Sequence, residues 1–201
     1  MRISRHLSNR QWTVLTCQGA MTAVVAIWAL EANWLSFAVG AVCLALSAAP
    51  ALCLRESALR GIVSLVMALL LAAHVLLGMY LGLYELSSIY DKFMHVIGST
   101  AIAVSVYAAL DAYCRQRSLS LPWTLRAATV FSVTLSSGVF WEFFEFGVDQ
   151  TGLFYAQRGL TDTMIDLFAD GLGAVIAILL FLPGRAPVSA LLPLKQRRTV
   201  S

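Results

Sequence analysis

The sequence has few charged residues, and this scarcity excludes most classes of soluble protein. Only 12% of its 201 residues are Asp, Glu, Lys or Arg, whereas 59% are hydrophobic and the mean hydropathy is +0.78. A composition this evenly apolar excludes a soluble domain, even one carried on a single membrane anchor. The sequence therefore predicts an all-α, polytopic membrane protein.

Cysteine is also scarce, and its positions argue against a disulfide. The four cysteines include no CxxC pair. Cys17 and Cys43 fall inside apolar segments, Cys53 lies near the end of one, and Cys114 lies in a basic loop. We expect no disulfide on the outer face of the membrane.

Long apolar runs occupy most of the chain. A helix needs about 20 apolar residues to cross a bilayer core of roughly 30 Å. Six segments meet this requirement and leave almost no length for an extramembrane domain, so residues 1–201 are interpreted as one integral membrane domain. The expected spans are residues 12–30, 34–54, 61–80, 93–110, 123–143 and 164–182.

The basic residues predict the orientation of these spans. Twelve of the fourteen Lys and Arg residues fall on the side that holds both termini, and only Lys92 and Arg158 fall on the other. Because basic residues accumulate in cytoplasmic loops, both termini are expected in the cytoplasm of a bacterial cell, with the protein in its inner membrane. The basic side requires no partner beyond anionic membrane lipids, and no nucleic-acid-binding signature is visible.

Acidic residues are concentrated between Gly138 and Gly173, with long apolar runs on both sides. This segment holds six carboxylates: Glu142, Glu145, Asp149, Asp162, Asp166 and Asp170. A carboxylate in hydrocarbon costs several kcal/mol unless it is paired, protonated, metal-bound or hydrated, so an ionisable residue in a span indicates a functional site.

The start of the fourth expected span adds a further pair. Asp91 and His95 are four residues apart and therefore share one helical face, whereas Lys92 is expected to point elsewhere and extend to the interface. The fourth span begins at the outer face, the fifth ends there and the sixth begins there. One inward-facing group is therefore expected to contain six residues: Asp91, His95, Glu142, Glu145, Asp166 and Asp170.

The charge at this rim predicts a compensating cation. Eight acids, now including Glu85 and Asp91, face only Lys92 and Arg158, and like charges in a low dielectric cannot all stay ionised without compensation by metal or protons. Carboxylates and histidine suit Mg²⁺, Mn²⁺, Fe²⁺ or Zn²⁺. The spacing matches neither ExxH nor HExxH. The expected metal ligands are His95, Glu142, Glu145, Asp166 and Asp170.

Three functions remain open at this stage. The first is a metal-dependent hydrolase or transferase that acts on a lipid or cell-envelope precursor, with Asp91, His95, Glu142 and Asp166 catalytic and with Lys92 or Arg158 binding an anionic headgroup. The second is a proton- or cation-coupled transporter, and the third is a non-catalytic scaffold. His74, within the third span, is interpreted either as a hydrogen-bonding residue or as a ligand.

Three stretches of the chain resemble known bacterial membrane proteins: YDKFMHVIGST, WEFFEF and RGLTDTMIDLFADGLGA. They resemble the uncharacterised inner-membrane family typified by YjdF and, more distantly, the VanZ-like family. Asp91, Lys92 and His95 match the DKxxH of the VanZ-like pattern, Glu142 its later Glu and Asp166 its final Asp, whereas Asp170 replaces an amide. The resemblance implies an integral membrane protein and, for VanZ-like proteins, a link to glycopeptide resistance and the cell envelope.

Overall fold

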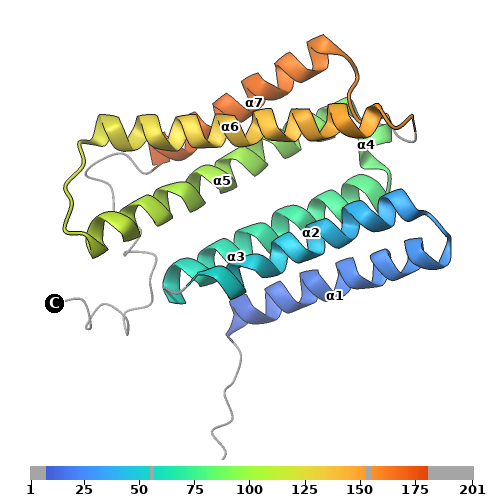
Figure 1. Cartoon of the computed structure of the whole chain (residues 1–201), viewed down its shortest axis with the longest axis horizontal. Helices are drawn as coiled ribbons and strands as arrows, with labels where there is room; N and C mark the ends of the chain where they lie inside the picture. The colour runs from blue at the N-terminus through green and yellow to red at the C-terminus, as the bar shows by residue number, and fades with distance from the viewer. Residues whose placement is uncertain (1–7, 55–56, 153–154, 181–201) are drawn as a thin grey trace, which may run out of the picture. The chain divides into compact units, whose positions relative to one another are not determined.

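The protein is described by a computed structural model over residues 8–54, 57–152 and 155–180 (Figure 1). Over these ranges the ordered elements are all helices, and no strand is present. In chain order the helices are α1 (Asn9–Leu30), α2 (Trp34–Cys53), α3 (Ser57–Ala72), the π-helix η1 (Ala73–Tyr80), α4 (Leu83–Leu86), α5 (Ser88–Gln116), α6 (Trp123–Asp149) and α7 (Leu160–Leu180).

Six helical segments in these ranges are long and apolar enough to cross a membrane, as predicted. They begin or end within a few residues of the expected spans, except that two are longer. The fourth extends over Ser88–Gln116 and the fifth over Trp123–Asp149, because polar residues continue each helix beyond its apolar part. Residues 181–182, expected to end the last span, lie outside the described residues.

The chain divides into two compact units, with the boundary between Asp91 and Lys92. In unit 1, helices α1, α2 and α3 pack against one another around an apolar core. This core contains Met21, Val24, Trp28, Cys43, Leu71 and Val75. Helix α3 continues into η1, where Nδ1 of His74 lies 2.7 Å from the hydroxyl oxygen of Tyr84. His74 therefore has the hydrogen-bonding partner that one of its two interpretations requires.

Unit 2 contains α5 from Lys92 onward, with α6 and α7. Helices α6 and α7 pack along each other (Figure 1), and Ala103, Val130 and Ala177 form a small apolar cluster. Helix α7 also approaches the backbone of α5 at Gly173, where an added Cβ would lie 2.5 Å from the carbonyl oxygen of Val96. This close approach brings the polar residues of α5 and α7 near one another.

Candidate functional site

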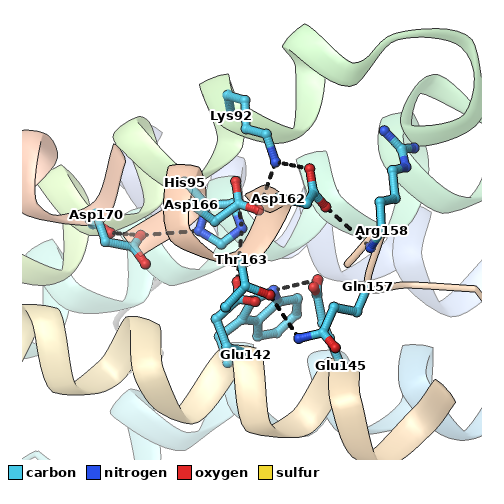
Figure 2. A network of polar contacts seen from close by, with 12 residues as sticks. Lys92, His95, Glu142, Glu145, Gln157, Arg158, Asp162, Thr163, Asp166 and Asp170 are labelled. Atoms are coloured by element: carbon cyan, nitrogen blue, oxygen red, sulfur yellow. Dashed lines mark hydrogen bonds and ion pairs between the residues drawn. The ribbon is translucent and has the colours of Figure 1, made fainter. Parts of the chain in front are cut away.

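Among the described residues of unit 2, one histidine and three carboxylate side chains are buried. His95 comes from α5, Glu142 from α6, and Asp166 and Asp170 from successive turns of α7 (Figure 2). Their exposed fractions are 8%, 4%, 1% and 2% in that order. The sequence predicted that these four residues belong to one site, and the structure brings them together.

One ring nitrogen of His95 faces Asp170. Nδ1 lies 3.1 Å from Oδ1 of Asp170, and the hydroxyl of Ser99 donates a hydrogen bond to the same oxygen. An ionised carboxylate only accepts hydrogen bonds, so this contact requires a hydrogen on Nδ1. In a neutral His95, Nε2 would then carry a lone pair.

The other ring nitrogen of His95 faces two carboxylates. Nε2 lies 3.7 Å from Oδ1 of Asp166 and 3.9 Å from Oε1 of Glu142. Both separations exceed the roughly 3.2 Å limit of an ordinary N–H···O hydrogen bond. Both carboxylate oxygens of Glu142 are buried and receive no hydrogen bond of ordinary geometry from the described residues, although Thr163 and Gln157 lie beside them. Nε2 and the two carboxylate oxygens thus face one another beyond the distance of an ordinary hydrogen bond.

Lys92 neutralises part of this charge. Its Nζ lies 2.5 Å from Oδ1 of Asp162 and 2.6 Å from Oδ2 of Asp166. Lys92 was expected to point elsewhere than Asp91 and His95 and to extend to the interface, but its ammonium instead contacts two aspartates of α7, one of which also faces His95. Asp166 consequently uses one oxygen for the ammonium and turns the other toward His95.

The remaining predicted site residues lie nearer the edge of this cluster. Asp91 is half-buried one turn before His95 on α5, with a carboxylate oxygen within 4.8 Å of a ring nitrogen of His95. Glu145 accepts a 2.8 Å hydrogen bond from Nε1 of Trp141. Arg158 is exposed, and its backbone N–H donates to Oδ2 of Asp162. None of these three lies among the four buried residues.

Two residues that support Asp170 were missed from the sequence. Ser99 donates to Asp170, and Gly138 on α6 provides the space for its carboxylate, because an added Cβ would lie only 2.7 Å from Cγ of Asp170. The spacing of both residues in the sequence could have identified them. Ser99 lies four residues after His95 and Gly138 four before Glu142, so each shares a helical face with a predicted site residue.

Asp149 belongs to the fold rather than to the buried cluster. Its carboxylate accepts hydrogen bonds from the backbone N–H groups of Ala156 and Gln157, at 2.6 and 3.0 Å. The side chain of Gln157 in turn donates to the hydroxyl of Thr163, at 2.7 Å. Asp149 thus anchors the segment that leads into α7. This structural role accounts for one of the six acidic residues between Gly138 and Gly173, and no functional site is needed to explain it.

The cluster retains negative charge after Lys92 is counted. Glu142, Asp162, Asp166 and Asp170 supply four carboxylates against the one ammonium of Lys92, so these residues retain three negative charges when His95 is neutral, before Asp91 at the edge is counted. Protein ligands lie about 2.0 to 2.2 Å from a Zn²⁺ ion, so two ligands of one ion are at most about 4.4 Å apart. The separations of 3.7 and 3.9 Å from Nε2 satisfy this limit. Each of these two pairs therefore lies within reach of one ion, and the ligand atoms of Asp91, His95 and Asp166 all lie within 4.8 Å of one another.

Comparison with known proteins supports membrane insertion and gives no reaction. An "Uncharacterized protein" of Thermotoga maritima is 37% identical over 101 residues, which cover 50% of this chain and 51% of that relative. The alignment thus spans about half the length of the curated relative. No solved structure matches the chain. The model of the family described as "Predicted membrane protein (DUF2238)" matches residues 11–185, and the chain belongs to this family.

Proposed function

We propose that this membrane protein binds a divalent cation through Nε2 of His95 and the carboxylates of Glu142 and Asp166, and that it catalyses hydrolysis or group transfer on a lipid or cell-envelope precursor. One observation carries the proposal. Nε2 faces two buried carboxylate oxygens at 3.7 and 3.9 Å, although all three atoms carry lone pairs when His95 is neutral. Such an arrangement is repulsive until a cation lies between them.

A proton on Nε2 compensates the site less well than a metal ion. An imidazolium would stabilise the carboxylates best through a hydrogen bond of about 2.7 to 2.9 Å. The two carboxylate oxygens are about 1 Å farther away than that. A divalent ion also offsets two of the three remaining negative charges, whereas one proton offsets one.

The burial of Glu142 raises the free-energy cost of leaving its negative charge without a partner. Glu142 is 4% exposed and lies in α6, within a candidate span. A charge removed from water costs several kcal/mol unless it is paired. Because neither oxygen of Glu142 has a hydrogen bond of ordinary geometry from the described residues, a bound ion is the partner that its burial favours.

The proposed chemistry divides among the residues of the site. A bound divalent ion would polarise a phosphoryl or carbonyl oxygen and activate a water molecule. Glu142 has a second carboxylate oxygen to accept a proton from that water, and Lys92 holds Asp166 in place. Arg158, exposed beside Asp162, provides a positive charge for an anionic headgroup. Asp91, at the edge of the cluster, is a further candidate for proton transfer.

A coupled transporter is less well supported. A permeation pathway requires polar groups to continue across the membrane, but Ala103, Val130 and Ala177 form an apolar cluster farther along the same three helices. The buried polar cluster therefore does not continue through this part of the three helices. Uptake into proteoliposomes driven by a pH gradient and abolished by Asp170→Asn would favour the transporter instead.

The proposal also includes the orientation in the membrane. The distribution of Lys and Arg supports cytoplasmic termini in a bacterial inner membrane and hence a site in the outer leaflet. A lipid or a lipid-linked envelope precursor is the substrate class that such a site meets. A cysteine placed at exposed Gly152 should then react with a membrane-impermeant maleimide in intact cells that have a permeable outer membrane.

Two glutamates on α6 provide a matched test of the metal site. Glu142→Gln and Glu145→Gln make the same chemical change three residues apart, but only Glu142 faces Nε2 of His95. Full-length protein purified in detergent, incubated with Zn²⁺ or Mn²⁺ and then desalted, should retain metal as wild type and as Glu145→Gln. Glu142→Gln should retain at least tenfold less. Equal metal in both variants would overturn the site.

Catalysis requires a second measurement. Metal-loaded wild type in vesicles of bacterial lipid extract should produce a new lipid species or a released headgroup by mass spectrometry, and Glu142→Gln should not. If wild type binds metal but leaves the lipids of the extract and an added polyprenyl diphosphate unchanged, the proposed reaction on such lipids is wrong and a binding role replaces it.

A further inference from the structure

We infer that Asp170 is a positioning residue that fixes the proton on Nδ1 of His95 and thereby presents Nε2 as the ligand atom. The sequence placed Asp170 among the metal ligands, so this inference gives it a different role. It deepens the proposed function and rests on it in one respect, because it takes Nε2 of His95 to be the atom that binds the metal ion.

The hydrogen bonds at Asp170 define the geometry. Oδ1 lies 3.1 Å from Nδ1 of His95 and accepts a hydrogen bond from the hydroxyl of Ser99. Since the carboxylate is an acceptor for both groups, the contact selects the tautomer of His95 with hydrogen on Nδ1. Metal-binding histidines commonly donate their other ring N–H to a carboxylate, which orients the ring and raises its basicity.

Asp170 and the two proposed carboxylate ligands lie on different sides of the His95 ring. The two nitrogens of an imidazole point in different directions, and Asp170 lies on the Nδ1 side, whereas Glu142 and Asp166 face Nε2 (Figure 2). An oxygen bonded to Nδ1 is therefore on the wrong side of the ring to share an ion with Nε2.

Gly138 keeps the carboxylate of Asp170 in this position. The side chain of Asp170 lies directly against the backbone of α6 at Gly138, and any Cβ there would overlap Oδ2. Asp170 is 2% exposed, and its Oδ2 receives no hydrogen bond from the described part of the chain. Packing against Gly138 together with the two donors at Oδ1 therefore fixes the carboxylate, which in turn fixes His95.

The first test reads the tautomer directly. Nitrogen-15 NMR of the full-length protein labelled at histidine, with the His95 signals identified from a His95→Ala sample, should show hydrogen on Nδ1 in wild type. Asp170→Asn should change this pattern, because an amide that turns its NH₂ toward Nδ1 favours hydrogen on Nε2. Hydrogen on Nε2 in the wild type, or an unchanged pattern in Asp170→Asn, would overturn the inference.

The second test separates positioning from ligation by affinity and stoichiometry. In a Zn²⁺ titration, Asp170→Asn should still bind one ion per chain at saturation, with affinity lowered about 10- to 100-fold, as for other losses of a carboxylate behind a histidine ligand. Gly138→Ala should lower affinity similarly. Gly147→Ala on the same helix is the matched control, because an added Cβ there meets nothing within 4 Å.

The outcomes distinguish this inference from the proposed function. If wild type binds no divalent metal while Asp170 still controls the His95 tautomer, the metal site fails and the positioning role of Asp170 stands. If Asp170→Asn loses the ion completely, as expected for His95→Ala, Asp170 is itself a ligand. The positioning role then fails and the metal site stands.

Discussion

The two units of this chain are each built around three long apolar helices, yet their interiors differ in kind. In unit 1 the helices meet through Met21, Trp28 and Val75. In unit 2 they meet around buried His95 and three buried carboxylates: Glu142, Asp166 and Asp170. Apolar packing is evidently sufficient to join three helices of this sequence.

The polar interior of unit 2 therefore needs a reason other than folding. Hydrogen bonds between membrane helices contribute only about 0.6 kcal/mol on average, less than the cost of burying a charge. Small residues already allow close packing in unit 2, as at Gly173 against α5. The proposed metal site would account for this difference between the units.

The largest effect is expected from breaking the buried ion pair of unit 2. Asp166→Ala leaves Lys92 without the more buried of its two aspartate contacts, and removing one partner of such a pair costs about 3 to 5 kcal/mol. Denaturant unfolding in detergent measures the loss. Asp162→Ala removes a more exposed contact of the same lysine and should cost clearly less. Equal losses would show that burial at Asp166 contributes nothing.

Truncating the core of unit 1 should affect stability without affecting the site. Met21 is fully buried, and Met21→Ala should lower the free energy of unfolding by about 2 kcal/mol or more. Its metal content per folded chain should match that of wild type. A folded Met21→Ala protein with less bound metal would contradict the assignment of the site to unit 2.

A smaller effect is expected where helices α5 and α7 touch. Gly173→Ala introduces a Cβ against the backbone of Val96 and Thr100, and overpacking of this kind costs about 1 to 3 kcal/mol. Because the change separates the helices that carry His95 and Asp166, metal affinity should fall as well. Gly171→Ala is the control, since its nearest atom would be 3.9 Å away, in Phe131. Equal unfolding curves for the two variants would show that the close approach does not matter.

The smallest effect is expected at the edge of the site. Trp141→Phe removes the indole N–H that donates to Glu145, a loss of about 1 kcal/mol in unfolding free energy. Retained metal should stay at the wild-type level in the same preparations. A marked loss of metal would mean that Glu145 helps to hold the ion, as the sequence analysis proposed.

The sequence predicted the six spans because hydropathy depends on composition alone. It also predicted that His95, Glu142, Asp166 and Asp170 meet, since helical spacing and the ends of neighbouring spans bring them to one depth. It did not predict that Lys92 contacts two aspartates of α7, because a flexible four-carbon side chain can extend to the interface or to a neighbouring helix. The roles of Ser99 and Gly138 depend on contacts between helices, which spacing within one helix does not define.

The central claim is tested most directly by the metal content of the two histidine variants. His74 lies in unit 1 beside Tyr84, and His95 lies in unit 2 among the buried carboxylates. After loading with Zn²⁺ and desalting, wild type and His74→Ala should each retain about one ion per chain, and His95→Ala should retain almost none. Equal metal in His95→Ala and wild type, or none in either, would contradict the account.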